Sequence, residues 1–533
     1  MLRLSSARRA LRRLSTAASP SSSSSTSPEA LERAFLLGNY WPDGVRGQPG
    51  LAFESGSGCV LRASDGREYL DFFAGIAVNA LGHSDPAVAE VLAAQARKVQ
   101  HVSNLYHTWE PLRLAEQLVR TAPQFKKVFL CNSGTEANEG ALKFAKKHAL
   151  AAALRAAAGL PAGARPPPFT AFGCKSSAPT ACFTQGGMCG CWPQAANNSV
   201  ALGVKNEVLA FKNGFHGRSM GSLAATHKPA IRWQFAPFPA DVRFARFNNL
   251  DGARARGAPF LQLHSTHTHT HTHTHSHFSH APPPPPPPPP HPSVSPPPHT
   301  HTPDVHKLWT PKIGAVIVEP VQGEGGITPA APGFLRALKD LCEARGALLI
   351  VDEVQCGLGR TGRLWAHEAH DVAPDMMTLA KPLAAGLPIG AVLLTDAVAA
   401  SVWPGEHGTT YGGNPLVAAV AEHVLGRIAE PAFLAAVRAR GEQLLAGMRA
   451  LGARFPHAVV EVRSGGGLFV GVELAPGAPF KALQEAALAR GLLIISCGDN
   501  VVRLCPPLVI TEAEVAQGVR VIGEAMAEAF PKK

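Results

Sequence analysis

The segment LLIVDEVQCGLGRTG (residues 348–362) joins a short apolar run to a pair of carboxylates and a glycine-rich turn. The apolar part, residues 347–353, is expected to form a buried strand. An earlier apolar run, IGAVIVEP (residues 313–320), predicts another buried strand, and between the two Pro332 opens a helical pattern that Gly346 ends. Strand, crossover helix and strand in this order predict an α/β fold with a mostly parallel sheet.

The same alternation continues on both sides of this segment. Upstream, KKVFLC (residues 126–131) predicts a strand that leads through a tight turn into a helix from Thr135. Downstream of about Val420 the pattern changes to helix, strand pair, helix, strand and a final helix from Thr511, which indicates a smaller α/β domain. We therefore expect residues 1–28 to be a leader, 86–420 the large domain, and 29–85 with 421–533 the N- and C-terminal parts of the small domain.

The predicted leader combines serines with arginines that flank one apolar helical face. This composition is typical of an organelle transit peptide, and its amphipathicity favours the mitochondrial matrix over the chloroplast stroma. A Ser-rich tail without a targeting role is the alternative. The leader holds five arginines, so the net charge of +11 falls to +6 without it. Because no basic stripe lies elsewhere and no apolar run reaches the ~18 residues of a membrane span, we expect neither a nucleic-acid partner nor a membrane.

Two stretches fit no packed domain. Residues 149–205 mix Ala, Pro, Gly, Cys and Ser without periodicity, and residues 254–310 contain THTHTHTHTHSH before a proline run. A repeated CA dinucleotide encodes alternating His and Thr, which indicates translated microsatellite or retained intron sequence. A metal-binding histidine tract and a polyproline ligand are the alternatives. If the mature protein contains these inserts, we expect them to be disordered surface loops.

Three kinds of site are disfavoured by the motifs. A strand ending in Asp-Glu is similar to the Mg²⁺-binding strand of P-loop ATPases, but the chain lacks G-x-x-x-x-G-K-[ST]. Gly357, Gly359 and Gly362 satisfy the dinucleotide-binding pattern GxGxxG, yet they do not follow the strand directly and the next segment makes a poor helix. The ten cysteines form no CxxC pair and match no zinc spacing, which favours free thiols and no metal site.

A carboxylate at the C-terminal end of a strand suits a pyridine cofactor. Open α/β sheets bind ligands at this edge, and a carboxylate keeps the ring nitrogen protonated, so that the ring can withdraw electrons. Asp352 occupies this position. In MMTLAKPLAAGLPIG (residues 376–390), Lys381 follows an apolar run and precedes a Gly/Pro-rich turn, so its amine can project into a cleft at the sheet edge. Considered alone, such a lysine would be a solvated surface charge.

Four further motifs offer groups that such a cofactor and its substrates need. The SGT turn (residues 133–135) opens a helix and can hold an anion, with a plain helix cap as the alternative. FHGRS (residues 215–219) offers a ring for stacking and an arginine for a carboxylate, although a buried Phe and a surface Arg would give the same pattern. HGTTYGGNP (residues 407–415) supplies hydroxyls. Arg503 lies in an apolar strand, where its charge needs a carboxylate ligand or a buried salt bridge.

In combination, these segments resemble the class III aminotransferases, which depend on pyridoxal 5'-phosphate and have the fold-type I architecture. The resemblance extends from about Asn39 to Phe530 without the two inserts. Within the class, LDFFAGIAVNALGHSDP and HVSNLYHT are similar to the acetylornithine aminotransferases, most of all to the plant-type organellar ones. The other motifs that carry it are NSGTEANEGALKFAKK, FHGRSMGSLAAT, VEPVQGEGG, LIVDEVQCGLGRTGRLWAHE, TLAKPLAAGLPIGA, HGTTYGGNP and VRLCPPLVI.

The resemblance implies roles for the matching residues. Lys381 would carry the cofactor covalently and move the proton, and Asp352 would pair with the ring nitrogen, which makes these two the expected catalytic residues. Glu324 would neutralise Arg503 while the amino donor is bound. The implied cofactor-binding residues also include Ser133, Gly134, Thr135, Phe215, Gln355 and Thr410 of the partner subunit in a homodimer. The implied substrate-binding residues are Arg218, Glu324, Thr409 and Arg503.

The implied reaction transfers the δ-amino group of N²-acetyl-L-ornithine to 2-oxoglutarate, giving N-acetylglutamate 5-semialdehyde and glutamate in arginine synthesis. Ornithine or 4-aminobutyrate as donor is the nearest alternative, and a non-catalytic binding protein with the same fold is an alternative of another class. The chain departs from the family pattern in two places. Ala384 and Ala385 replace glycines after the lysine, and the second insert replaces most of a helix before the strand at Ile313.

Overall fold

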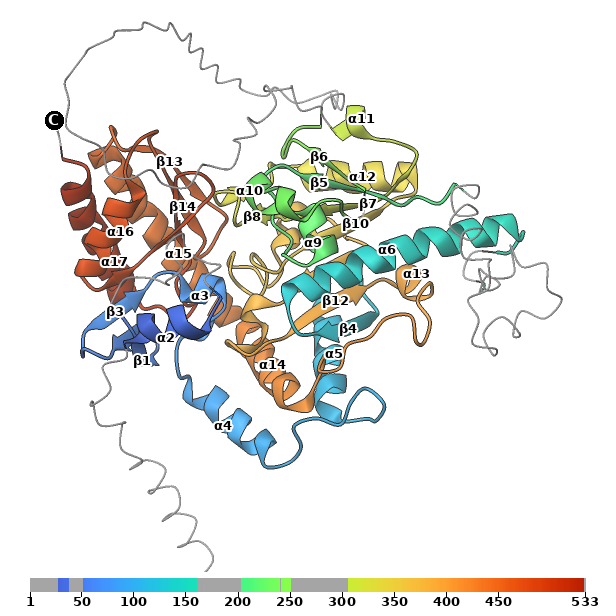
Figure 1. The fold of residues 1–533 in the computed structure, drawn as a ribbon, viewed down its shortest axis with the longest axis horizontal. Coiled ribbons are helices and arrows are strands. Elements are labelled where there is room, and N and C mark those ends of the chain that lie inside the picture. The colour runs from blue at the N-terminus through green and yellow to red at the C-terminus, as the bar shows by residue number, and fades with distance from the viewer. Residues whose placement is uncertain are drawn as a thin grey trace, which may run out of the picture.

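The computed structural model describes residues 27–37, 51–161, 164, 203–239, 241–250 and 305–531. Its centre is a seven-stranded sheet with the order β4-β12-β11-β10-β7-β5-β6 (Figure 1). Neighbouring strands run parallel except at β12, which is antiparallel to both β4 and β11. The predicted α/β fold with a mostly parallel sheet is confirmed. The strands are β4 (Lys127–Cys131), β5 (Glu207–Phe211), β6 (Val242–Ala245), β7 (Ile313–Val318), β10 (Leu348–Asp352), β11 (Met376–Leu379) and β12 (Gly390–Leu394).

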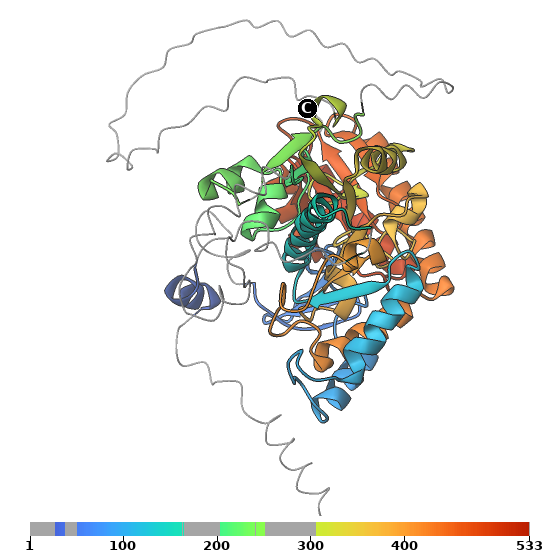
Figure 2. The ribbon, with the colours of Figure 1, turned by 90° about the vertical axis from the view of Figure 1, so that its right-hand side faces the viewer.

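Helices cover both faces of the central sheet (Figures 1 and 2). On one face, Ile317 of β7 is buried in a cluster with α6 (Gly134–Ala157). On the other face, Val316 of the same strand is buried with α12 (Phe334–Arg345). Because alternate side chains are buried on opposite faces, the central strands are apolar at successive positions. This explains why the sequence shows unbroken apolar runs there rather than a period of two.

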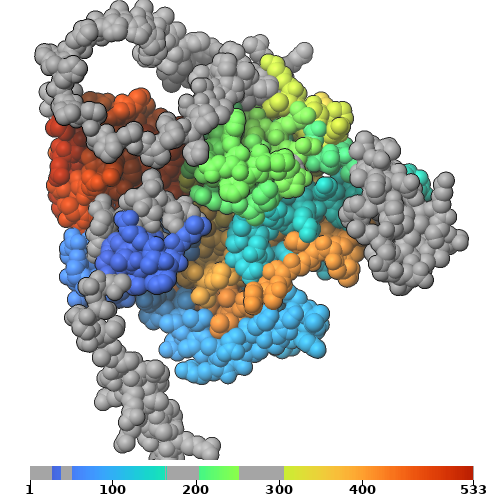
Figure 3. Space-filling model, in the orientation of Figure 1, coloured from blue at the N-terminus to red at the C-terminus, as the bar shows by residue number. Residues whose placement is uncertain are grey.

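The N- and C-terminal segments meet through strand pairing. β15 (Leu492–Leu493) pairs in parallel with β3 (Glu68–Asp71) and completes a sheet with the order β1-β2-β3-β15. A second four-stranded sheet has the order β13-β14-β17-β16. Figure 3 shows the C-terminal segment, in red, beside the N-terminal segment, in blue. Their strands are β1 (Phe53–Ser57), β2 (Val60–Ala63), β13 (Val459–Ser464), β14 (Val470–Leu474), β16 (Ile495–Cys497) and β17 (Val501–Leu504).

The remaining elements surround these three sheets. β8 (Val321–Gln322) and β9 (Thr328–Pro329) form a separate two-stranded sheet. Within the part of the chain that is described, none of the helices has the length and apolar character needed to cross a membrane. The further helices are α2 (Pro28–Phe35), α3 (Ala74–Ala77), α4 (Pro86–Ala96), α5 (Trp109–Thr121), α9 (Met220–Ala225), α10 (Pro229–Arg232), α11 (Val305–Leu308), α13 (Asp396–Ala399), α14 (Pro415–Ile428), α15 (Pro431–Arg454), α16 (Phe480–Ala489) and α17 (Glu512–Ala529).

Helices extend into both stretches that the sequence predicted to be unpacked inserts. α6 continues to Ala157, nine residues into the stretch expected to be unpacked from residue 149, and Ala151 and Leu154 are buried. Alanine has the highest helix propensity, so an Ala-rich run extends a helix that is already formed. At the other insert, α11 lies within residues 254–310, and Val305 is buried in the cluster around α12. Residues 162–163, 165–202 and 254–304 of the inserts, and residues 1–26 of the leader, lie outside the described residues.

Two smaller predictions concern the start of α12 and the state of the cysteines. The helix expected from Pro332 begins two residues later, at Phe334, because Gly333 takes a left-handed conformation with φ 79°. Six cysteines in the described residues are free and buried, namely Cys59, Cys131, Cys342, Cys356, Cys497 and Cys505. The other four fall outside the described ranges.

Gly441 of α15 lies against the backbone of the loop before β14. A Cβ at this position would lie 2.1 Å from the carbonyl oxygen of Gly467. Because a backbone atom cannot rotate away, we expect Gly441→Ala to lower the free energy of unfolding by about 2 kcal/mol, despite the better helix propensity of alanine. Urea unfolding and the thermal midpoint measure this change.

Gly452 in the same helix is the matched control. A Cβ there would meet nothing closer than 3.4 Å. Gly452→Ala should leave the stability unchanged or raise it by about 0.5–1 kcal/mol. Equal losses in the two variants would contradict this account of the packing at Gly441.

Candidate active site

The carboxylate of Asp352 is buried at the C-terminal end of β10. Its Oδ2 accepts a hydrogen bond from Nδ2 of Asn138 at 2.8 Å and lies 2.7 Å from Nδ1 of His216. Its Oδ1 accepts from the backbone amide of Val354 at 3.0 Å. Burial raises the pKa of Asp352, but the hydrogen bonds and charge of His216 and the other donors outweigh burial and hold the pKa below its usual value. The group is therefore an ionised carboxylate at neutral pH.

Lys381 opens the short 3-10 helix η4 (Lys381–Ala384), which follows β11. It lines a cavity of about 320 Å³ together with Asp352, Phe215 and Gln355. Burial lowers the pKa of the Lys381 amine, while the charge of Asp352 opposes this shift. A lowered pKa favours the neutral amine, which is the nucleophilic form. The structure thus brings the two expected catalytic residues to one cavity.

Ala385 ends this 3-10 helix in a left-handed conformation, with φ 48°. This region of backbone space costs a residue with a Cβ ~1–2 kcal/mol, whereas glycine adopts it freely. The departure from the family glycines at Ala384 and Ala385 therefore has a local cost at the second position. Ala384 is buried and has no such positive φ.

The SGT turn lies at the N-terminus of α6 and lines the same cavity. Ser133 caps the helix, since its hydroxyl accepts from the amide of Glu136 at 3.2 Å. The hydroxyl of Thr135 lies 2.7 Å from that of Ser219 and so joins this turn to the FHGRS loop. A Cβ on Gly134 would lie 2.6 Å from a methyl of Val354, so only glycine fits there. A helix N-terminus with exposed amides favours an anion such as a phosphate.

Arg503 of β17 is buried, with only 1% of its surface exposed. Its Nη1 lies 2.9 Å from Oε2 of Glu324 and 3.4 Å from Oε1 of Gln355. The other carboxylate oxygen of Glu324 accepts a hydrogen bond from Nζ of Lys228 at 3.0 Å. The structure therefore places Glu324 and Arg503 in direct contact beside the cavity that Lys381 lines.

Of the other predicted site residues, Arg218 lines the cavity of Lys381, whereas Thr409 and Thr410 do not. Arg218 is exposed and lines the cavity of Lys381. Thr409 and Thr410 do not line that cavity in the chain described. The Thr409 hydroxyl accepts from Nδ2 of Asn132 at 2.9 Å, and Thr410 is exposed on the loop before α14. A cavity role for Thr410 therefore requires a second subunit, as the family resemblance implies.

Sequence reasoning missed three buried polar residues of this cavity. Asn138 and His216 hold Asp352, and Glu319 directly follows β7, the parallel neighbour of β10. The signals were present, because Asn138 follows Gly134 by one helical turn and His216 lies inside FHGRS. Glu319 was expected only as the end of a strand, although the carboxyl ends of adjacent parallel strands share one sheet edge.

Glu319 is a second buried carboxyl group beside Asp352. Its two oxygens accept from the backbone amides of Phe215 at 2.9 Å and Gly323 at 3.1 Å. Burial raises the pKa of Glu319 to about 7, with Asp352 adding to this shift and His216 opposing it. Glu319 thus joins the loop of Phe215 to the loop that carries Glu324.

The sequence matches the family model described as "Aminotransferase class-III" over residues 44–268 and 260–526. This chain belongs to the class III aminotransferases. Its cofactor is pyridoxal 5'-phosphate, and it is a transaminase. A probable mitochondrial acetylornithine aminotransferase of Dictyostelium discoideum is 40% identical over 471 residues, which cover 88% of this chain and 82% of that protein.

Two further relatives agree with this assignment. The mitochondrial acetylornithine aminotransferase of Alnus glutinosa is 38% identical and is matched over 93% of this chain and 87% of its own length. The crystal structure of N-acetylornithine aminotransferase from Stenotrophomonas maltophilia matches with a TM-score of 0.62 and 30% identity, covering 90% of this chain and 96% of that one.

The residues around the cavity of this class III aminotransferase fit pyridoxal phosphate. An ionised carboxylate, a lysine with a lowered pKa and a helix N-terminus kept open by Gly134 line one cavity. They match, respectively, the ring nitrogen, the aldehyde and the phosphate of the cofactor.

The raised pKa of Glu319 predicts how stability depends on pH. Between its ordinary value of 4.5 and about 7, the folded protein binds more protons than the unfolded chain. The stability that Glu319 contributes must therefore fall as the pH rises through this range. Relative to the unchanged protein, cofactor-free Glu319→Gln should gain on the order of 2 kcal/mol between about pH 5 and about pH 8, measured by urea unfolding.

A constant offset is expected on top of this trend, because the amide of Gln keeps only one acceptor oxygen for the two backbone amides. Glu343→Gln is the control, since Glu343 is 64% exposed on α12. A difference between the Glu319→Gln variant and the unchanged protein that does not vary with pH would contradict the assignment of the raised pKa.

Proposed function

We propose that this chain is an acetylornithine aminotransferase, which transfers the δ-amino group of N²-acetyl-L-ornithine to 2-oxoglutarate. The products are N-acetylglutamate 5-semialdehyde and glutamate, in arginine synthesis. The observation that carries the proposal is the meeting of Lys381, the ionised Asp352 and Glu324 at one cavity, with Arg503 in contact with Glu324. The similarity to relatives named acetylornithine aminotransferases supports the choice of donor.

The residues around the cofactor have separate tasks in this proposal. Pyridoxal phosphate supplies a ring that withdraws electrons from the carbon bearing the amino group. Lys381 would hold the cofactor through its Nζ until the amino group of the substrate replaces it. The released Nζ would then take the proton from that carbon and return it on the cofactor side. Asp352 keeps the ring nitrogen protonated. Ser133, Gly134 and Thr135 are assigned to the phosphate. Phe215 is assigned to stacking on the ring, and Gln355 to a hydrogen bond with the ring hydroxyl.

Substrate binding requires one site to accept two different molecules in turn. Arg218 is exposed at the cavity and is assigned to the carboxylate of the donor. Arg503 is assigned to the carboxylate of 2-oxoglutarate, because a buried guanidinium needs an anion. While the donor is bound, Glu324 supplies that anion. We retain the proposal that Thr409, on the loop before α14, binds substrate.

A homodimer is part of the proposal. Trp109 and Tyr411 are 71% and 64% exposed, and Leu105 is 83% exposed, so large apolar side chains lie uncovered. Nδ2 of Asn104 donates to the carbonyl of Thr409 at 3.0 Å, which ties this surface to the loop of Thr410. In the proposed homodimer a second copy covers these side chains, and Thr410 of the partner subunit is assigned to the phosphate on the family resemblance.

An organelle is the proposed location, and the mitochondrial matrix the specific compartment. The similarity to proteins named mitochondrial supports an organelle, and the composition of the leader favours the matrix. We also retain the proposed domain limits of 29–85, 86–420 and 421–533, with residues 1–28 as transit peptide.

The proposed function is tested by titrating the cofactor-loaded protein with one donor at a time. The visible absorbance of the bound cofactor should change at the lowest concentrations with N²-acetylornithine and only at higher ones with ornithine or 4-aminobutyrate. In Lys381→Ala the band of lysine-bound cofactor should be absent, and the transfer rate should fall by roughly 10³-fold or more. Lys339→Ala, which removes a lysine from α12, is the control.

Each outcome has a definite meaning. A stronger response to ornithine or 4-aminobutyrate would replace the donor and leave the aminotransferase chemistry in place. A protein that binds the cofactor in the same way with and without Lys381, and transfers no amino group, would contradict the proposal and favour the non-catalytic binding protein.

A further inference from the structure

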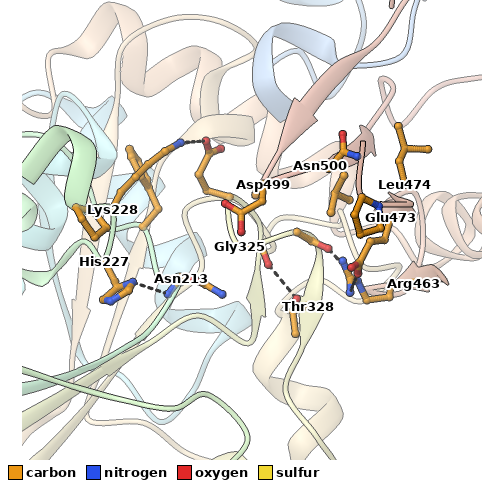
Figure 4. A pocket seen from close by; sticks show the side chains of 18 residues that line it. Asn213, His227, Lys228, Gly325, Thr328, Arg463, Glu473, Leu474, Asp499 and Asn500 are labelled. Carbon is orange, nitrogen blue, oxygen red and sulfur yellow. Dashed lines mark hydrogen bonds and ion pairs between the residues drawn. The ribbon is translucent and has the colours of Figure 1, made fainter. Parts of the chain in front are cut away.

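Glu324 lies at the boundary between two cavities. It lines the cofactor cavity with Lys381, and it also lines an adjoining cavity of about 520 Å³ that includes Lys228 (Figure 4). Lys228 does not line the cofactor cavity, and its amine reaches Glu324 from the adjoining one. A carboxylate at this position can therefore turn toward either side.

The two oxygens of Glu324 contact two different cations. Oε2 lies 2.9 Å from Nη1 of Arg503, and Oε1 lies 3.0 Å from Nζ of Lys228. The side chains of Arg503, Glu324 and Lys228 are 2%, 25% and 42% exposed, so the three groups form a series from the interior to the solvent. Burial raises the pKa of Glu324, but the two cations outweigh burial and lower it, which keeps the group charged.

Lys228 is well placed to remain the partner of Glu324. It directly precedes α10, and Figure 4 shows its amine pointing across the cavity along the dashed line of this ion pair. Arg463, the other cation labelled in that view, lies 2.5 Å from Glu473 and 3.0 Å from Glu461. It is therefore already neutralised by its own carboxylates.

The charges of these three residues leave a surplus. Arg503 and Lys228 are cations and Glu324 is an anion, so the group carries one net positive charge. A carboxylate that enters at Arg503 brings this sum to zero. Without Lys228 the same event would place two carboxylates against one guanidinium, and like charges close together repel strongly at a partly buried site.

We propose that Lys228 is a positioning residue for the acceptor substrate, which holds Glu324 when the carboxylate of 2-oxoglutarate replaces it on Arg503. This inference rests on the proposed roles of Arg503 and Glu324. Lys228 contacts Glu324 in both states, but it is one of two cations while the donor is bound and the remaining one when Arg503 holds the acceptor. Its contribution is thus larger in the second state, which is the condition for shifting an equilibrium.

The test compares Lys228→Met with the unchanged protein in three measurements. Calorimetry gives the affinity of the cofactor-loaded protein for glutarate, a dicarboxylate that lacks the keto group and does not react. Rapid mixing gives the KM for the donor and the KM for the acceptor in their separate half-reactions. We expect the dissociation constant of glutarate and the KM for the acceptor to rise about tenfold, while the KM for the donor changes less than about threefold.

Three further variants make the result specific. Lys228→Arg should restore glutarate binding, because it returns a cation to the same place. Lys228→Gln replaces the Met variant if the latter does not fold, which circular dichroism and melting show. Lys481→Met removes a lysine that is 86% exposed and lies 3.9 Å from Glu485 on α16, and it should leave glutarate affinity unchanged.

Unchanged glutarate affinity in the neutral variants, an equal loss for donor and acceptor, or failure of Lys228→Arg to restore binding would each overturn the role of Lys228. The proposed function fails in a different way. In that case the unchanged protein itself would not transfer an amino group from acetylornithine, whatever the Lys228 variants do to the binding of glutarate.

Discussion

An ionised carboxylate in the protein interior is costly unless donors surround it, and Asp352 meets this condition at the end of β10. Its donors come from three places in the chain, namely Asn138 on α6, His216 in the FHGRS loop and the amide of Val354. The hydrogen bonds to this one carboxylate therefore fix α6, the FHGRS loop and the end of β10 relative to one another. The cofactor cavity is the space that these elements leave in front of Lys381.

A second carboxyl group, that of Glu319, lies at the same sheet edge, and its pKa is shifted in the opposite direction. It accepts from two backbone amides rather than from charged or side-chain donors, and burial raises its pKa to about 7 where that of Asp352 is lowered. Neighbouring parallel strands thus lead to two carboxyl groups whose pKa values are shifted in opposite directions. Asp352 provides charge to the cavity, whereas Glu319 links the loop of Phe215 to the loop of Glu324.

The sequence predicted those features that depend on local patterns. The apolar runs of β7 and β10 are buried on both faces, and the N-terminus of α6 and the C-terminal helix from Thr511 follow from capping residues. The antiparallel position of β12 between β4 and β11 could not be predicted, because strand order depends on contacts between distant segments. The pairing of β15 with β3 across the chain is of the same kind.

The structure places Lys381 and Asp352 at one cavity. These two residues and Arg503 could be predicted as candidates, because family motifs mark them. The residues that support the site could not, since Asn138, His216 and Glu319 have ordinary positions in a helix, a loop and a strand until the fold brings them together. Lys228 is a further example. Lys228 belongs to none of the motifs, and only its distance to Glu324 indicates a role for it.

We expect the ionised Asp352 to keep the ring nitrogen of the bound cofactor protonated. Nuclear magnetic resonance of the protein loaded with pyridoxal phosphate that carries ¹⁵N in the ring measures this state directly. The ¹⁵N resonance should have the chemical shift of a protonated ring nitrogen in the unchanged protein and that of an unprotonated one in Asp352→Asn. The same shift in both proteins, or an unprotonated nitrogen beside the intact Asp352, would contradict this role of Asp352.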